Sequence, residues 1–407
     1  MPKNMHNKTI IILNDYAFVN GGASKVAIDE AVGLKKTGAR VIFFAACAPI
    51  ADELANSGVE IVCLGQKDLA NFGKNPLSML QGIWNFKATR ELKKLLKTLD
   101  AGNTIIHLHG YTKALSASVV RVAPAQKLKI ICTLHDFFTA CPNGAFFDYV
   151  AVASCQKRAL SVSCVARNCD KRAYHHKLFR VVRSLVQKHF GGLPSGVKNY
   201  ITLSQQSLNL LRPYLPKDAK FYALENPIAA EKLPPINVAK NQETIFVGRL
   251  DAEKGIEILL EAAEKTASKL TLVGDGALRG LAQARGNCRV TGWVSPAQVW
   301  SELGNARALV FPSLWYETYG LVVAEAAARG IPAIVSDISA AVERVENGVS
   351  GWHFKSGDAG DLARVLELIK NDEIVTRAGI AAYNNFWKNP PTSEQHTAQL
   401  LKIYDDL

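Results

Sequence analysis

Short apolar runs rich in β-branched residues alternate with longer amphipathic stretches along nearly the whole chain. In the first half, such runs predict strands at residues 9–13, 40–45, 59–64, 104–109, 128–134 and 199–203. In the second half, they predict strands at 244–247, 270–273, 289–291, 308–311 and 332–335. Strands that are apolar on both faces and separated by helical patterns are typical of parallel sheets covered by helices. The pattern therefore predicts an α/β fold with doubly wound parallel sheets.

The alternation breaks shortly before residue 228, where the chain becomes polar and rich in proline. A break of this composition is typical of a linker between domains. We therefore expect a first Rossmann-like domain at 1–227, a linker at 228–241 and a second Rossmann-like domain at 242–390. A last helix is expected at 391–407, and a return of this helix to the first domain is one option. Ligands of such folds bind at the carboxyl ends of the strands, which would face a central cleft.

The composition is that of an ordinary globular protein. Of the 407 residues, 48% are hydrophobic and 21% are charged, which excludes a disordered or collagen-like chain. The first apolar run is too short for a signal peptide, and no run is long enough to span a bilayer. The eight cysteines are therefore expected in a reducing cytosol rather than in disulfides. We expect a cytoplasmic protein, either soluble or peripheral on the cytoplasmic face of the membrane.

The net charge of +12 is unevenly distributed along the chain. Residues 1–227 hold 30 basic and 14 acidic residues, whereas residues 228–407 hold 18 basic and 22 acidic residues. The surplus is densest at 151–200, which has 10 basic residues and 1 acidic residue. An acidic partner is therefore expected for the first domain only.

The first candidate motif, Gly21-Gly22, stands between a predicted strand and a predicted helix. Glycines at this place let the backbone approach a ligand, and the start of the helix offers free N–H groups to an anion. The Gly-x-Gly-x-x-Gly spacing of a dinucleotide site is absent. Taken alone, the motif fits an anion site and a plain tight turn equally well.

Two cations follow the first strand of the second domain. Gly248 ends this strand, and Arg249 and Lys254 precede the next helix. A guanidinium offers a planar fork of donors and an ammonium offers a compact charge, and together they suit a diphosphate. The alternative is a pair of solvated cations beside Asp251 and Glu253. The position at a strand end favours the ligand site.

Two carboxylates lie near the start of a later helix. Glu317 precedes the helix, and Glu325 lies within it among alanines. The backbone N–H groups at the helix start are suited to holding a phosphate. A buried carboxylate such as that of Glu325 needs a hydroxyl or a cation as a partner. The two hydroxyls of a ribose fit this need, and an internal salt bridge is the alternative.

Six short motifs follow one another along the chain: Gly21-Gly22, His135-Asp136, Asn226-Pro227, Gly248-Arg249-x4-Lys254-Gly255, Gly274-Asp275-Gly276 and Glu317-x7-Glu325. Together this set resembles glycosyltransferase family 4, the retaining enzymes of the GT-B fold, and in particular those that build bacterial cell-surface glycans. No single motif is decisive, but their order and spacing are specific, and the second half matches more closely. The resemblance implies two Rossmann-like, doubly wound domains that face a central cleft.

The resemblance implies a role for each motif of the second domain. Arg249 and Lys254 would neutralise the diphosphate of a nucleotide-sugar donor, and Glu325 would bind its ribose. Glu317 would hold the sugar and phosphate together with the backbone of four residues at the helix start, which are Tyr319, Gly320, Leu321 and Val322. With His135, the residues Glu317, Arg249 and Lys254 form the expected catalytic set.

The remaining implied contacts come from both domains. Gly21 and Gly22 would close over the diphosphate from the first domain, and His135 would reach the donor sugar near the reacting carbon. The stretch Gly292-Trp293-Val294 would lie beside the base of the donor. Tyr319 is a mild departure, because the family often has Phe at this position.

The implied reaction transfers a sugar from a nucleotide-sugar donor to a glycan or lipid-linked glycan in the synthesis of a lipopolysaccharide or exopolysaccharide. The acceptor hydroxyl would attack on the same face from which the diphosphate departs, and the leaving group would be stabilised by cations and a helix N-terminus. No cofactor or divalent metal is required for this chemistry. Two alternatives stay open, namely a nucleotide-sugar epimerase on the same fold and a non-catalytic nucleotide-sugar-binding protein.

Four cysteines lie in a non-periodic excursion of the first domain at 136–172, and these are Cys141, Cys155, Cys164 and Cys169. Thiolates at this density predict a structural zinc site that would staple the segment. Their spacing contains no Cys-x2-Cys pair, and buried thiols without metal are the alternative.

Residues 171–190 predict a basic amphipathic helix, in which apolar residues recur at helical spacing and cations occupy the other side. Such a helix fits an anionic membrane surface. Packing against the first domain, with the basic face in solvent, is the alternative. No nucleic-acid partner is expected, because no recognised module accompanies the charge.

Overall fold

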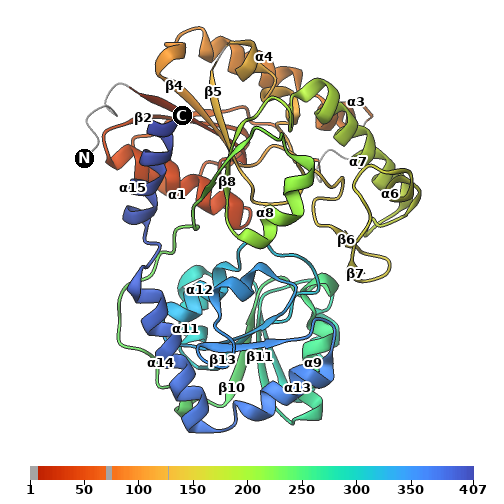
Figure 1. Cartoon of the computed structure of the whole chain (residues 1–407), viewed down its shortest axis with the longest axis vertical. Helices are drawn as coiled ribbons and strands as arrows, with labels where there is room; N and C mark the ends of the chain where they lie inside the picture. Colours follow the sequence, from red (N-terminus) through yellow and green to blue (C-terminus); the bar gives the residue numbers. More distant parts are fainter. Residues whose placement is uncertain (1–7, 70–75, 127) are drawn as a thin grey trace. The chain divides into compact units, whose positions relative to one another are not determined.

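The computed structural model describes residues 8–69, 76–126 and 128–407 (Figure 1). The chain divides into two compact units. The first contains Met1–Ala145, Lys157–Pro227 and Pro391–Leu407, and the second contains Phe146–Gln156 and Ile228–Pro390. Residues 146–156 were expected in the first domain but group with the second unit, where the Gln156 amide donates a hydrogen bond of 2.8 Å to the Tyr316 hydroxyl.

The first unit is built on a seven-stranded sheet in the order β3-β2-β1-β4-β5-β8-β9, in which all neighbours are parallel. The strands are β1 Thr9–Tyr16, β2 Arg40–Cys47, β3 Glu60–Cys63, β4 Thr104–Leu108, β5 Lys129–Thr133, β8 Asn199–Thr202 and β9 Lys220–Ala223. The central strand β1 is fully buried from Ile10 to Leu13, because it pairs with β2 and β4 and carries apolar side chains on both faces.

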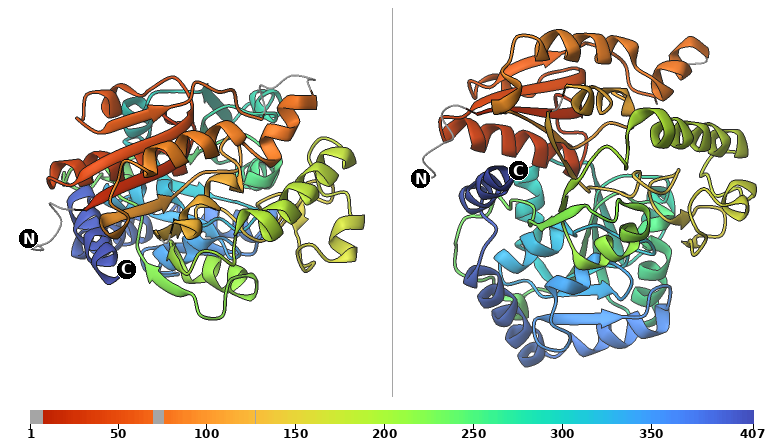
Figure 2. Two further views of the ribbon diagram at one scale, coloured as in Figure 1. Left: turned by 90° about the horizontal axis from the view of Figure 1, so that it is seen from above. Right: turned by 45° about the horizontal axis from the view of Figure 1, so that its top comes forward.

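The helices of the first unit are α1 Gly22–Lys36, α2 Asp52–Ala55, α3 Pro76–Ile83, α4 Phe86–Leu96, α5 Val122–Ala125, α6 Val162–Ala166, α7 Tyr174–Val186, α8 Gln205–Leu211 and α15 Ser393–Asp406. The last helix, α15, packs against α1, which follows the first strand of the sheet. Its residues Leu400, Leu401 and Tyr404 belong to the core of this unit. The carboxyl-terminal segment therefore completes the unit with which the chain begins (Figure 2).

The second unit is built on a six-stranded parallel sheet in the order β12-β11-β10-β13-β14-β15. Its strands are β10 Glu243–Val247, β11 Lys269–Val273, β12 Cys288–Gly292, β13 Ala306–Phe311, β14 Ala333–Ser336 and β15 Gly351–Phe354, and a short hairpin pairs β6 Phe147–Asp148 with β7 Ala153–Ser154. Its helices are α9 Ile256–Lys265, α10 Arg279–Gln283, α11 Pro296–Leu303, α12 Leu321–Ala328, α13 Ala359–Leu368 and α14 Asp372–Lys388.

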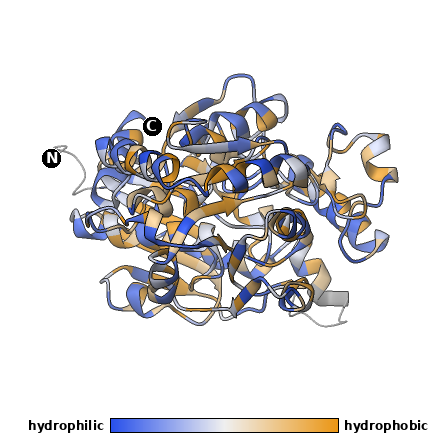
Figure 3. Cartoon of the chain, turned by 90° about the horizontal axis from the view of Figure 1, so that it is seen from below, coloured by the Kyte–Doolittle hydropathy of each residue, from blue (hydrophilic) through white to orange (hydrophobic). Residues whose placement is uncertain are grey.

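The predicted fold class is confirmed, because each unit is a parallel sheet with helices packed around it. Every run predicted as a strand coincides with one, and apolar positions are concentrated in the strands (Figure 3). Four of the described strands lie outside the predicted runs: the four-residue edge strands β9 and β15 and the two-residue strands β6 and β7, all of which are too short to show a clear pattern. In the described part of the chain, no helix has both the length and the apolar character needed to cross a membrane.

Candidate active site

Three loops of the second unit leave the carboxyl ends of β10, β11 and β13 and are tied together by backbone hydrogen bonds. Leu250 donates to the carbonyl of Asp275 over 2.9 Å, and Leu314 donates to the carbonyl of Glu253 over 2.9 Å. The carboxyl ends of parallel strands are the usual place for ligands in open α/β sheets. These loops carry the candidate residues of the second domain.

Glycines allow these loops to touch backbone to backbone. Gly274 has φ +145°, and a Cβ at this position would overlap the carbonyl of Gly248. Gly255 has φ +71°, and its Cβ would overlap the carbonyl oxygen of Pro312. Because only glycine tolerates both the backbone conformation and the close approach, these positions hold the three loops at a fixed separation. Lys254, which precedes Gly255, is thereby placed beside the loop after β13.

Lys254 and Glu317 form an ion pair, with Lys254 Nζ 2.6 Å from Glu317 Oε1. The same oxygen accepts hydrogen bonds from the Ser313 hydroxyl over 2.8 Å and from the Trp315 indole over 2.6 Å. Lys254 Nζ also lies 5.1 Å from the centre of the Trp315 ring. Burial opposes the charge of Glu317, but Lys254 and these donors outweigh it and lower the pKa of the carboxyl. Glu317 is therefore a fixed, charged carboxylate.

Arg249 lies beside two buried carboxylates. Its Nη1 is 2.6 Å from Asp251 Oδ2 and its Nη2 is 3.1 Å from Glu253 Oε1. The two acidic side chains are 8% and 2% exposed, whereas that of Arg249 is 53% exposed. Among the described residues, these bonds use two of the five N–H groups of the guanidinium, so three remain for a ligand. The residue is both the partner of Asp251 and Glu253 and a half-exposed donor at a strand end.

The start of helix α12 is a candidate site for an anion. Gly320 precedes it with φ +86° and has no side chain that could cap the first N–H groups. Tyr319 is buried, with the Arg344 guanidinium carbon 3.5 Å from the centre of its ring. The uncapped N–H groups and the positive end of the helix dipole favour an anion at this place. The backbone of 319–322 is therefore a candidate site for a phosphate.

Glu325 lies within α12 without an ion pair to any described residue, so the internal salt bridge weighed above is not formed. Burial raises the pKa of its carboxyl. A partly buried carboxylate without a cation is destabilising in the protein alone and is suited to accepting hydroxyl hydrogen bonds from a ligand.

The residues predicted to lie beside the base of the donor are at and just after the carboxyl end of β12. Gly292 has φ +75°, and a Cβ there would lie 3.4 Å from Arg279 Nη1. Trp293 is 81% exposed, and Val294 packs against the core of the unit.

In the first unit, the candidate residues lie at the ends of β1 and β5. Gly21 has φ +126°, and the space around a Cβ at this position is empty within 4 Å. Gly21 precedes α1 and has no side chain that could cap the helix. His135 follows β5, and its Nε2 lies 2.9 Å from Nδ1 of His109. Burial and the neighbouring His109 lower the pKa of His135 well below its usual value.

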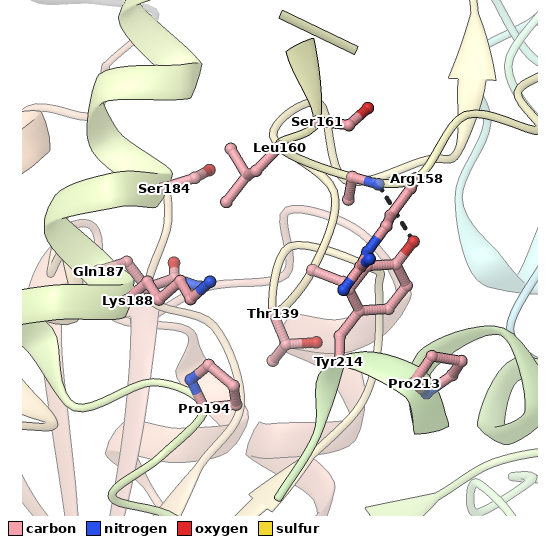
Figure 4. Close-up of a pocket in the computed structure, with 12 residues that line it drawn as sticks. Thr139, Arg158, Leu160, Ser161, Ser184, Gln187, Lys188, Pro194, Pro213 and Tyr214 are labelled. Atoms are coloured by element: carbon pink, nitrogen blue, oxygen red, sulfur yellow. Dashed lines mark hydrogen bonds between the residues drawn. The ribbon is translucent and has the colours of Figure 1, made fainter. Parts of the chain in front are cut away.

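A cavity of about 370 Å³ also opens in the first unit (Figure 4). Its lining includes two cationic side chains, Arg158 and Lys188, which approach it from opposite sides. Hydroxyl, amide and aromatic groups complete the wall, and they come from Thr139, Ser161, Ser184, Gln187 and Tyr214. Two cations among hydroxyl groups can bind an anionic, hydroxylated molecule.

The loops of the second unit lie within a stretch that matches a known protein family. Residues 231–385 match the family described as Glycosyl transferases group 1. The match covers most of the second unit. The matched range contains Arg249, Lys254, Glu317 and Glu325, together with the glycines that hold their loops.

The chain is 32% identical over 142 residues to the glycogen synthase of Mycobacterium tuberculosis, a match of 32% of this chain and 34% of that protein. It is 33% identical over 144 residues to the O-antigen chain mannosyltransferase C of Escherichia coli, or 33% and 39% of the two chains. These matches span little more than a third of each relative. The crystal structure of Anabaena HepE in complex with UDP and glucose is similar over 98% of this chain and 100% of that one, with 16% identity and a TM-score of 0.67. The chain thus has the GT-B fold, in which each of the two units is a Rossmann-like parallel sheet.

Outside the matched range, two of the four clustered cysteines, Cys164 and Cys169, contact a buried lysine. Lys177 is fully buried, and its Nζ lies 3.2 Å from the sulfur of Cys169 and 3.5 Å from that of Cys164. Cys141 and Cys169 both contact Asn143. In the described chain, no three of the four thiols come within 4.8 Å of one another, and none of the cysteines forms a disulfide. Cys155 belongs to the segment that groups with the second unit.

In the basic helix α7, cationic side chains are buried and apolar side chains are exposed, which is the reverse of an ordinary surface helix. Lys177, Arg183 and Ser184 are buried. Arg183 donates from Nη1 to the carbonyl of Thr112 over 3.0 Å. An apolar stripe faces outward instead, with exposed fractions of 38–48%, and it consists of Tyr174, Leu178, Val182 and Leu185. Neither alternative in the sequence analysis anticipated buried cations beneath an exposed apolar stripe.

Proposed function

We propose that the chain is a retaining glycosyltransferase that transfers a sugar from a nucleoside-diphosphate donor to a glycan or lipid-linked glycan in cell-surface polysaccharide synthesis. The observation that carries the proposal is the Lys254–Glu317 pair beside the open start of α12, within a group 1 domain. The names of the relatives, which include a polysaccharide synthase and an O-antigen mannosyltransferase, support this class of acceptor.

The charges of the loops account for the chemistry. Breaking the bond between sugar and diphosphate places positive charge on the sugar and negative charge on the leaving phosphate. The unused N–H groups of Arg249 and Lys254 and the start of α12 stabilise the phosphate, and such preorganised donors are often the largest catalytic contribution. Glu317 is held by three donors and positions Lys254 and the sugar. Glu325 accepts hydrogen bonds from the ribose hydroxyls. No covalent intermediate is required when the acceptor attacks the same face.

On the acceptor side, we assign the cavity of the first unit to an anionic part of the acceptor. Arg158 and Lys188 supply charge for a phosphate or carboxylate, and the surrounding hydroxyl groups match those of a sugar. This assignment agrees with the location of the basic surplus in residues 151–200. A diphosphate-linked or otherwise charged glycan fits the cavity better than a neutral one.

The apolar stripe of α7 favours a membrane as the place where the acceptor is met. The neighbouring helix α3 packs beside α7 and exposes Met79 and Leu80 by 42% and 60%. Lys171 and Arg172 are exposed at the start of α7. Apolar side chains flanked by cations are the pattern of an interfacial helix on anionic lipid. The buried polar side of α7 explains why the apolar side is left outward.

A panel of donors tests the proposed function. The thermal midpoint of the chain is measured with UDP, GDP, ADP and dTDP and with their sugars, because a ligand that binds only the folded chain raises the midpoint. The best donor is then incubated with acceptor fractions, and the anomeric configuration of the product is determined by NMR. We expect one base to stabilise the chain and the product to keep the configuration of the donor. An inverted product would overturn the retaining mechanism, and an epimerised donor without nucleotide release would overturn transfer.

Flotation with liposomes tests the membrane contact. The variant Leu178→Ser/Leu185→Ser is compared with Ile380→Ser, which alters an exposed apolar side chain of the second unit. We expect the wild-type chain and Ile380→Ser to float with phosphatidylglycerol vesicles and the double variant to remain in the soluble fraction. Equal flotation of all three chains would exclude this surface.

A further inference from the structure

A group of ionisable side chains is buried in the core of the first unit, beneath α15. Glu30 comes from α1, and His107 and His109 come from β4 and the residue after it. Because the two histidines are two positions apart on an extended strand, they project to the same face of the sheet. Their side chains are fully buried, and that of Glu30 is 1% exposed. Ionisable side chains buried in this way need partners, because an unpaired buried charge is destabilising.

Three atoms of this group converge. Glu30 Oε2 lies 3.2 Å from His107 Nδ1 and 3.2 Å from His109 Nε2, and all three atoms lie within 4.8 Å of one another. Despite this distance, Glu30 Oε2 and His109 Nε2 have no hydrogen bond of acceptable geometry to any described residue. An unsatisfied buried polar atom costs about 1–3 kcal/mol. Two that face each other indicate that a further atom belongs between them.

The other polar atom of each side chain is held by a partner. His107 Nε2 lies 2.7 Å from the Thr133 hydroxyl, and His109 Nδ1 lies 2.9 Å from His135 Nε2. Glu30 Oε1 lies 3.0 Å from His396 Nε2 on α15. Ligands of metal ions are oriented in this way, with the outer atom of each imidazole or carboxylate fixed by a hydrogen bond.

We propose that Glu30 Oε2, His107 Nδ1 and His109 Nε2 bind a structural zinc ion. Zinc with nitrogen and oxygen ligands at about 2.0–2.1 Å in a tetrahedron places those ligands about 3.3 Å apart, which matches the separations from Glu30 Oε2. Two imidazoles in the set favour zinc over magnesium or calcium. The hydroxyl of Tyr404, 2.7 Å from His107 Nδ1, is the nearest further oxygen for the fourth position. The ion would join α1, β4 and α15.

The test is the metal content of the full-length chain. Protein expressed with added zinc is dialysed and analysed by plasma mass spectrometry, beside three variants. Glu30→Gln/His109→Gln removes two proposed ligands, Cys164→Ser/Cys169→Ser removes the clustered thiols, and His175→Gln alters an exposed histidine as a matched control. We expect one zinc ion per chain in the wild type, in the thiol variant and in His175→Gln, and loss of the ion only in Glu30→Gln/His109→Gln.

Cobalt substitution of the wild-type chain decides the outcome if the ligand variant does not fold. We expect a visible spectrum of tetrahedral cobalt without the intense absorption of a thiolate ligand. A wild-type chain without stoichiometric metal, zinc that is lost with Cys164 and Cys169, or a thiolate spectrum would each overturn the proposal. The readouts are independent of transferase activity, so failure of the proposed function would leave this test unchanged.

Discussion

The two units are built alike but handle charge in opposite ways. Both are parallel sheets whose chemistry-bearing residues follow strand ends. Residues 228–407 carry a deficit of 4 positive charges, and the cations at their candidate site are individually placed against carboxylates. Residues 1–227 carry a surplus of 16, with cations around a cavity and beside an exposed apolar helix. The proposed function thus relies on individually placed cations in the second unit and on a local surplus of cations in the first.

The contrast extends to what lies beneath the surface. In the second unit, Lys254 and Glu317 are 16% and 13% exposed and lie in loops that follow strand ends. In the first unit, Glu30 and its histidines are enclosed by α15. Ion-paired groups therefore lie in partly exposed loops of one unit and in the buried core of the other.

The largest effect is expected from Lys254→Met, which removes the ammonium but keeps the aliphatic stem over Trp315. If placed charge dominates in the second unit, kcat/KM for transfer should fall by about 10²–10³, the cost of losing one preorganised donor. Lys265→Met is the control, because Lys265 is an exposed cation paired with Glu261 in the same unit. Near-normal turnover of Lys254→Met, with a normal melting temperature, would show that Lys254 has no role in catalysis. It would also show that a single placed charge does not dominate in the second unit.

The next effect concerns the geometry that places this charge. Gly255→Ala should destabilise the second unit by about 1–2 kcal/mol from the left-handed backbone and by about 1–3 kcal/mol from overlap with Pro312. Gly280→Ala is the matched control, since a Cβ there meets nothing within 4 Å and the residue lies inside α10. It should be neutral or slightly stabilising. Urea denaturation measures both variants, and equal stability would show that the close approach is not required.

The sequence was sufficient for the fold because strands that are apolar on both faces leave few alternatives to a parallel sheet. It also placed Arg249, Lys254, Glu317 and Glu325 correctly at strand ends and near a helix start, since these positions follow from local order along the chain. It did not show that Lys254 pairs with Glu317, which depends on contact between two loops 63 residues apart. Motif spacing identifies residues, whereas tertiary contact decides their partners.

The sequence was least informative where the polarity of an element opposes its surroundings. Helical spacing in α7 suggested that its apolar side would be packed or would lie on a membrane, and nothing in the spacing indicated that Lys177 and Arg183 are buried. The same holds for Glu30, an acidic residue in the first helix whose histidine partners lie far along the chain. Such pairings come from long-range packing, which periodicity does not encode.

A smaller effect, of opposite sign on stability and on binding, is expected from Glu325→Gln. Burial raises the pKa of Glu325 in the folded chain, so the folded state favours the protonated form. The wild type therefore loses stability as the pH rises from the ordinary carboxyl value of 4.5 through the raised one, and the glutamine variant does not. At neutral pH, Glu325→Gln should be more stable than the wild type. Donor binding should weaken by about 1.5–3 kcal/mol, as for a hydrogen bond to a charged group.

Denaturation at acidic and neutral pH, together with donor titration, measures both effects of Glu325→Gln. Glu257→Gln, at an exposed position of α9, is the control and should show neither of them. A variant that binds the donor as the wild type does would show that the ribose is held elsewhere. A variant that gains no stability at neutral pH would show that the carboxylate is not penalised by burial.

The smallest effect is expected in the first unit, where the proposed membrane binding depends on many exposed cations and not on a single one. Lys171→Gln at the start of α7 should weaken binding to anionic vesicles by about 1 kcal/mol, which is roughly fivefold. The loss should shrink as salt is added, because exposed charges are screened within a Debye length of about 8 Å at physiological ionic strength. Lys388→Gln in the second unit should have no effect. Donor binding should be insensitive to salt over the same range if its cations act through short contacts. A uniform salt dependence of both activities would mean that the two units do not differ in how they use charge.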